Sequence, residues 1–148
     1  MNHQWPGRLR AYSAGSAPRP DLFPETRGVH PLALRTLADA KIPATDLHSK
    51  SWDQFIAQKD RLHFVFTLCD SAQTDMAEAC PIFPGQPLTA HWGVQDPAVA
   101  RGTEEEIQAV FREVFQIIQN RISLFGNLPI ETLAEFSLRQ RIEEIGRA

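Results

Sequence analysis

The sequence predicts an α/β fold in which helices cover both faces of a parallel sheet, giving three layers. Strand and helix signals alternate along the 148 residues in the order β-α-α-β-β-α-α. The clearest strand is the nearly continuous apolar run His63–Leu68, which is typical of a parallel strand buried on both faces. The clearest helix follows Gly102 and repeats apolar residues at helical spacing. A chain of this length most simply forms one domain.

The elements in the first third of the chain are short. Leu9–Ser13 is an apolar and aromatic run stopped by a glycine-containing turn, so we expect a buried strand there. Residues 17–29 hold three prolines and are typical of a loop. Pro31 fits the first turn of a helix that should end before Pro43. Ser51 is expected to cap a short helix.

The elements after residue 80 are a strand and a long helix. A further strand is predicted at Leu88–Trp92, after a proline-rich turn. Thr103 and Glu106 form a capping box at the start of the helix, and Gly126 marks its end. The apolar stripe of this helix comprises Ile107, Val110, Phe111, Val114, Ile118, Ile122 and Phe125.

The last part of the chain predicts one more amphipathic helix. Thr132 and Glu135 have the spacing of a second capping box. The apolar face of the helix that follows would carry Leu138, Ile142 and Ile145. We therefore divide the chain into an α/β domain over residues 1–126 and a helical extension over residues 127–148.

The composition excludes several classes of function. A net charge of −3, from 15 basic and 18 acidic residues, provides no positive field for nucleic acid or an anionic membrane. No apolar run reaches the roughly 18 residues that span a bilayer, and the N-terminal residues do not resemble a signal peptide. Two cysteines without a secretion signal are typical of reduced thiols, so we expect a cytoplasmic protein.

The residues with candidate chemistry lie between positions 67 and 98. Cys69 immediately follows the apolar run His63–Leu68, and Cys80 lies eleven positions later. The two thiols are interpreted as a redox pair, while the alternative is that Cys69 is a small buried hydrophobic residue. Asp96 precedes a proline, so it is a candidate acid or, alternatively, an ordinary turn aspartate.

Other polar residues favour structural interpretations. His91 is interpreted as a packed, hydrogen-bonded residue, and Lys50 as a solvated charge. The five histidines and two cysteines do not have the spacing of a zinc site, so we expect no bound metal.

Five segments in order carry a resemblance to a known family. They are AYSAGS at 11–16, VHPLALRTLA at 29–38, SKSWDQF at 49–55, FVFTLCD at 64–70 and CPIFPG…HWGVQDPA within 80–98. Together they resemble the low-molecular-weight protein tyrosine phosphatase superfamily, and more closely its thiol-dependent arsenate reductase branch. The resemblance runs from about residue 8 to residue 125 and is interrupted by a proline-rich insertion.

The resemblance implies a four-stranded parallel sheet with a C-x5-R phosphate loop between the first strand and the first helix. In that loop, main-chain amides and the arginine would hold an oxyanion, and a cysteine of low pKa would attack arsenate or phosphate. In the arsenate reductases a second cysteine displaces arsenite and a third resolves the resulting disulfide. Thioredoxin or a glutathione/glutaredoxin system would then reduce that disulfide, and no bound cofactor is implied.

The residues that match the family pattern are those after the phosphate loop. By position, Asp96 matches the general acid, Cys69 the displacing cysteine and Cys80 the resolving cysteine. The nucleophile and its arginine match nothing. Six positions after Cys69 is Asp75, and six after Cys80 is Gln86, so no C-x5-R pattern occurs.

The resemblance therefore implies an N-terminally truncated fold without the first strand and first helix. Ser13 and Ser16 match positions that would brace the phosphate loop through hydrogen bonds. The inner sheet edges left by such a deletion would expose unpaired N–H and C=O groups. Either the strands pair again with one another, or another chain covers these edges, for example a second copy in a homo-oligomer. An upstream in-frame strand with C-x5-R would instead restore the site.

Three functions stay open from the sequence. The first is an arsenate reductase-like protein, inactive as given, whose partners would be a small oxyanion and a thiol reductant protein. The second is a low-molecular-weight tyrosine phosphatase-like protein. The third is a non-catalytic remnant that acts through protein–protein contacts. The presence of both Cys69 and Cys80 favours arsenate reductase, because a phosphatase needs neither.

Overall fold

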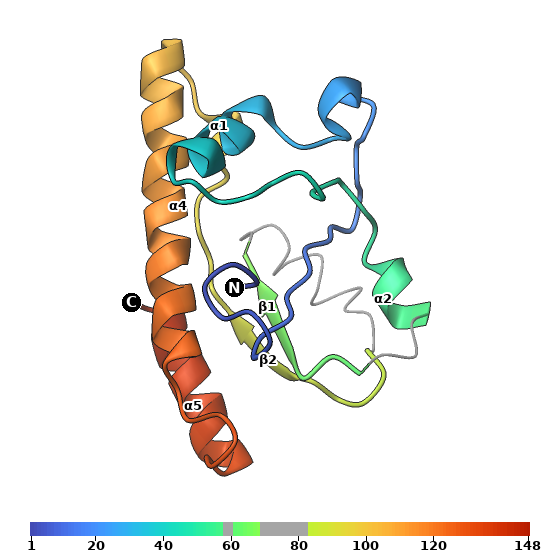
Figure 1. Ribbon diagram of the computed structural model, residues 1–148, viewed down its shortest axis with the longest axis vertical. Coiled ribbons are helices and arrows are strands. Elements are labelled where there is room, and N and C mark those ends of the chain that lie inside the picture. The colour runs from blue at the N-terminus through green and yellow to red at the C-terminus, as the bar shows by residue number, and fades with distance from the viewer. Residues whose placement is uncertain (58–60, 69–82) are drawn as a thin grey trace. The chain divides into compact units, whose positions relative to one another are not determined.

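A computed structural model describes residues 1–57, 61–68 and 83–148 (Figure 1). The chain forms two compact units, and each is described by itself. The first comprises residues 1–54 and 97–115, and the second residues 55–96 and 116–148. In chain order the described elements are η1 (Pro24–Thr26), α1 (Pro31–Asp39), α2 (Asp53–Ala57), β1 (Phe64–Thr67), β2 (Leu88–His91), η2 (Pro97–Val99), α4 (Glu104–Gly126) and α5 (Glu135–Gly146).

The second unit contains a parallel pair of strands, which confirms the predicted α/β class. β1 and β2 pair with Phe64 opposite Leu88 and Thr67 opposite His91. Both strands coincide with the apolar runs that predicted them. Because the strands are parallel, their carboxyl ends lie at the same edge of the sheet, and that edge is where α/β proteins generally bind ligands.

Aromatic side chains form the core of the second unit. The ring of Trp92 stacks on that of Phe66 with centroids 4.0 Å apart, and Phe125 meets Phe66 edge-on at 5.2 Å. Helix α5 packs against β2, and the indole N–H of Trp92 donates to the carbonyl of Ile142 at 2.9 Å. Trp92, Phe125 and Ile142 are almost completely buried. The predicted apolar face of α5 is therefore confirmed.

The second predicted capping box is wrong. Helix α5 begins at Glu135 with Ala134 at the N-cap position, and no side chain caps it. The hydroxyl of Thr132 donates instead to the carbonyl of Pro129 at 3.1 Å, within the preceding turn. A threonine hydroxyl competes for nearby main-chain groups, and here the turn provides the closer acceptor.

The capping box of α4 has the predicted reciprocal geometry. The N–H of Glu106 donates to the hydroxyl oxygen of Thr103 at 3.2 Å, and the N–H of Thr103 donates to the carboxylate of Glu106 at 2.7 Å. The helix ends at Gly126, as expected. The division of the chain at residue 126 stays a prediction.

Helix α1 belongs to the first unit and is held at its start by a histidine. The imidazole Nδ1 of His30 accepts the N–H of Leu32 at 3.1 Å. One turn later Thr36 is buried, and its hydroxyl donates to the carbonyl of Leu32 at 2.8 Å while accepting the side-chain amide of Gln108 at 2.8 Å. The helix ends at Asp39, ahead of Pro43 as predicted.

The strand predicted at Leu9–Ser13 is absent, because this segment pairs with no strand among the described residues. The carboxamide of Asn2 occupies both main-chain groups of Ala11, accepting its N–H at 2.7 Å and donating to its carbonyl at 2.9 Å. Tyr12 is 49% exposed, so the segment is not a buried strand either. A strand requires hydrogen bonds to a neighbouring strand, and the residue pattern of one segment does not show whether such a neighbour exists.

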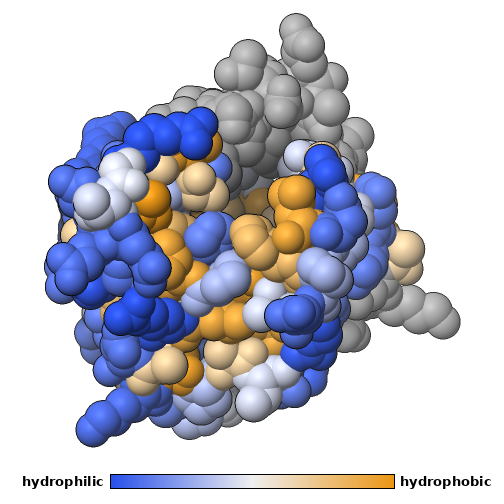
Figure 2. Space-filling view, turned by 90° about the horizontal axis from the view of Figure 1, so that it is seen from above, coloured by the Kyte–Doolittle hydropathy of each residue, from blue (hydrophilic) through white to orange (hydrophobic). Residues whose placement is uncertain are grey.

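The surface shown in Figure 2 is largely hydrophilic, with apolar side chains between the hydrophilic ones. Among the described residues, the most exposed large apolar side chains are those of Leu22, Val99 and Phe136. Within the described residues, no helix is both long and apolar enough to cross a membrane.

Candidate functional site

The loop that carries Ser13 and Ser16 is fixed by a single parallel bridge. Gly15 pairs with Ser51, through N–H donation from Gly15 to the carbonyl of Lys50 at 3.0 Å and from Trp52 to the carbonyl of Gly15 at 3.1 Å. Ser13 and Ser16 are both exposed. The structure therefore places the two serines on either side of one anchored glycine.

Lys50 has a structural role that the sequence did not indicate. Its ammonium group donates to the carbonyls of Ser13 and His48, each at 3.0 Å. The prediction of a solvated charge did not include these two hydrogen bonds. The physical reason is tertiary, because one acceptor lies 37 positions away in the sequence.

Ser51 caps the short helix α2, as predicted. Its hydroxyl oxygen accepts the N–H of Asp53 at 3.1 Å and its hydroxyl donates to the Asp53 carboxylate at 3.0 Å. The side chains of Lys50, Ser51 and Asp53 therefore all take part in hydrogen bonds that hold this segment.

The remaining predicted site residues belong to the second unit or lie outside the described residues. Asp96 is exposed and immediately precedes η2. Cys69 and Cys80 lie outside the described residues. Ser13 and Ser16 belong to the first unit, so the structure describes them separately from Asp96.

A hydrogen-bonded pair lies at the carboxyl ends of the two strands. The hydroxyl of Thr67 and the imidazole Nδ1 of His91 are 2.7 Å apart, and both residues are half-buried. The interpretation of His91 as a packed, hydrogen-bonded residue is thus confirmed. Its position at this edge of the sheet was not inferred from the sequence, because it depends on the register of the two strands.

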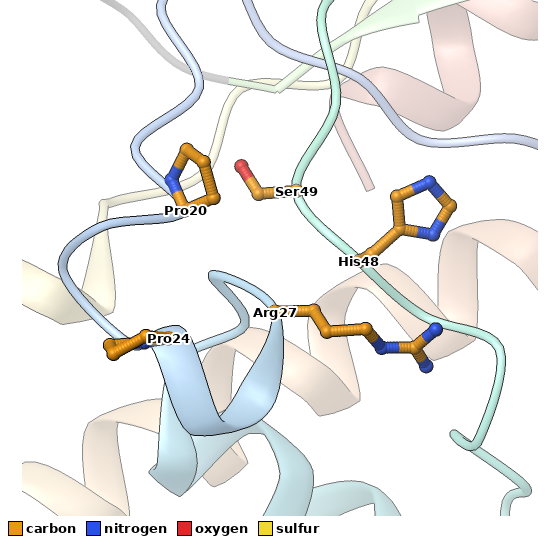
Figure 3. Close-up of a pocket in the computed structure, with 5 residues that line it drawn as sticks. All are labelled: Pro20, Pro24, Arg27, His48 and Ser49. Carbon is orange, nitrogen blue, oxygen red and sulfur yellow. The ribbon is translucent and has the colours of Figure 1, made fainter.

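The first unit has an open hollow of about 510 Å³ beside the loop of residues 48–49 (Figure 3). Its lining residues are Pro20, Pro24, Arg27, His48 and Ser49. A side chain at Gly28 would collide with Ser49 and Pro20, and Gly28 has a φ of +82°, so glycine is required there.

The lining of this hollow carries the positive charge of the Arg27 guanidinium. None of its described lining residues is an aspartate or a glutamate. The guanidinium of Arg27 also donates to the carbonyl of Thr45. Arg19 and Asp21 flank Pro20 in the sequence. The side-chain hydrogen bond from Arg19 lowers the pKa of the Asp21 carboxyl. The negative charge of the Asp21 carboxylate is thereby balanced by the Arg19 guanidinium.

Comparison with known proteins gives one consistent result. No family model matches the chain. It is 41% identical over 102 residues to the arsenate reductase of Halalkalibacterium halodurans, which covers 69% of each protein. It is 38% identical over 102 residues to the arsenate reductase of Oceanobacillus iheyensis, again 69% of each. The arsenate reductase of Bacillus subtilis is 35% identical over 117 residues, covering 79% of this chain and 74% of that protein.

Proposed function

This chain belongs to the arsenate reductase family, and on that premise we propose that it supplies the thiol relay of arsenate reduction. The match to proteins named arsenate reductase, at up to 41% identity, is the observation that carries the proposal. In it, a nucleophilic thiol that these 148 residues do not supply in a C-x5-R loop carries the arsenic. Cys69 attacks the sulfur of that thiol, forming a disulfide with it and releasing arsenite. Cys80 then attacks Cys69, frees the first thiol and leaves a Cys69–Cys80 disulfide. Asp96 serves as the general acid, and Ser13 and Ser16 brace the oxyanion site.

The position of Cys69 supports this role. It is the second residue after Thr67, the last residue of β1. Substrates of α/β proteins generally bind outside the carboxyl ends of parallel strands.

The chemistry balances with two thiols. Arsenic acid and two thiols give arsenous acid, a disulfide and water, so the thiols lose two electrons and arsenic gains them. Cys69 and Cys80 end the cycle as a disulfide, and a thiol donor such as thioredoxin or a glutathione/glutaredoxin system restores the two thiols. We place the protein in the cytoplasm, where such donors keep thiols reduced.

The relay follows an earlier step, the nucleophilic attack of a thiolate on arsenate. It requires a nucleophilic cysteine in a C-x5-R loop, and the 148 residues contain no such pattern. We therefore propose that the chain as given reduces no arsenate by itself. Pairing of two copies through exposed sheet edges stays a prediction.

Mild oxidation tests the relay. Treatment of the full chain with one equivalent of diamide should remove both titratable thiols and leave a monomer on a non-reducing gel. Cys69→Ser and Cys80→Ser are the matched controls, and each should keep its single thiol or form an intermolecular dimer. Retention of two free thiols in the unmutated chain, with folding verified by circular dichroism, would contradict the relay.

A further inference from the structure

Strand β2 has one edge paired with β1 and an outer edge that faces away from it. The N–H groups of Leu88 and Trp92 both donate to carbonyls on the β1 side, at 2.9 and 2.8 Å. Because main-chain groups alternate between the two edges of a strand, those of Thr89 and His91 are directed to the outer edge. Among the described residues, no further strand pairs with this outer edge.

The sequence of β2 does not protect its outer edge. Folded proteins prevent a free strand edge from pairing with another chain by means of charged side chains, prolines or a covering element. The strand Leu88–His91 contains no Lys, Arg, Asp or Glu, and Pro87 lies just before it rather than within it. The protection of this edge therefore depends on a neighbouring element.

The last turn of helix α5 lies against this outer edge. The carbonyl of Ile142 accepts the indole N–H of Trp92 at 2.9 Å, one helical turn before Gly146. A Cβ atom at Gly146 would collide with the carbonyl oxygen of His91 and would lie 2.9 Å from Cδ1 of Trp92. Since the carbonyl of His91 is directed to the outer edge, α5 covers the carboxyl end of that edge. In Figure 1, β2 lies between β1 and α5.

A buried arginine holds the end of α5 in this position. Arg121 is only 7% exposed, and one of its terminal nitrogens donates to the carbonyls of Trp92 and Gly93, at 2.8 and 3.0 Å. Its Nε donates to the carbonyl of Ala148 at 3.3 Å. A single guanidinium thus joins the segment that follows β2 to the segment that follows α5.

We propose that the last turn of α5 is a strap that prevents the outer edge of β2 from pairing with the same edge of a second copy of this chain. When the strap is displaced, the two edges pair antiparallel about a two-fold axis, because a closed dimer uses the same surface on both copies. Two copies of an uncharged strand meet no like-charge repulsion across such a pair, which favours a second copy as the occupant. No residue of the strap or of this edge takes part in the proposed thiol relay, so the two proposals are independent.

Displacing the strap by Gly146→Val tests the proposal, because the structure has no room for a side chain at this position. The molar mass of the full chain is measured by size-exclusion chromatography with light scattering, at matched concentrations and with a reductant that excludes disulfide cross-links. The Gly146→Val chain should have about twice the mass of the unmutated chain. Gln140→Val is the matched control, because Gln140 is exposed on the same helix, and it should leave the mass unchanged.

A second substitution distinguishes edge pairing from general aggregation. The N–H of Thr89 is directed to the outer edge, where a proline is tolerated but cannot donate to another strand. Thr89→Pro, added to Gly146→Val, should restore the mass of the unmutated chain. An unchanged mass for Gly146→Val, or a doubled mass that persists in the double variant, would overturn the proposal. If circular dichroism shows that Gly146→Val is unfolded, Gly146→Ala, which adds only the Cβ atom, takes its place under the same two criteria.

Discussion

Replacing Trp92 with alanine is expected to lower the free energy of unfolding by about 3–5 kcal/mol. Trp92 is only 2% exposed, and its ring stacks on Phe66 at 4.0 Å and lies 6.0 Å from that of Phe125. The substitution removes these contacts and leaves the carbonyl of Ile142 without its indole donor. Both effects act on the contact between β2 and α5.

Urea denaturation followed by far-ultraviolet circular dichroism measures this loss. Trp92→Phe retains most of the ring packing but not the N–H donor, so it should cost only about 1–3 kcal/mol. Phe136→Ala is the control, because Phe136 is 72% exposed and its removal should change stability by less than about 0.5 kcal/mol. Equal losses for Trp92→Ala and Phe136→Ala would show that the aromatic cluster is not the core of this unit.

Arg121→Met is expected to lower the free energy of unfolding by about 2 kcal/mol or more. Arg121 is 7% exposed, and one of its terminal nitrogens donates to the carbonyls of Trp92 and Gly93. Its Nε also donates to the carbonyl of Ala148 at 3.3 Å. Methionine keeps an apolar stem but has no N–H group, so these carbonyls would lose their donor.

The matched control for that experiment is Arg141→Met on helix α5. Arg141 forms an exposed ion pair with Glu144 at 3.1 Å. Exposed pairs contribute little, so the control should change the free energy of unfolding by less than about 0.5 kcal/mol. If both arginine variants were equally stable, the hydrogen bonds of Arg121 would make no net contribution.

The parts of the fold that the sequence predicted correctly depend on local patterns. The two strands of the parallel pair are apolar runs bounded by turns, and the start of α4 is a capping box whose members are three residues apart. The parts that were wrong depend on distant partners. Leu9–Ser13 has the composition of a strand, but its pairing groups at Ala11 are taken by Asn2, which no periodicity reveals.

In the candidate site too, local motifs could be predicted from the sequence, whereas contacts between distant residues could not. The motifs predicted the family, and the similarity to proteins named arsenate reductase confirms that prediction. The role of Lys50 in holding the loop of Ser13 could not be predicted, because ammonium groups on the surface are usually solvated. The pairing of Thr67 with His91 required the register of the two strands, because the two residues lie 24 positions apart in the sequence.

One coupled assay tests the central claim, that this chain carries the relay thiols of an arsenate reductase without carrying out the attack on arsenate. The oxidised chain is mixed with thioredoxin, thioredoxin reductase and NADPH, and NADPH consumption is followed before and after arsenate is added. We predict consumption of about one NADPH per chain, as one disulfide is reduced, and no further consumption with arsenate. No consumption by the oxidised chain, or a steady arsenate-dependent rate that Cys69→Ser abolishes, would contradict the account.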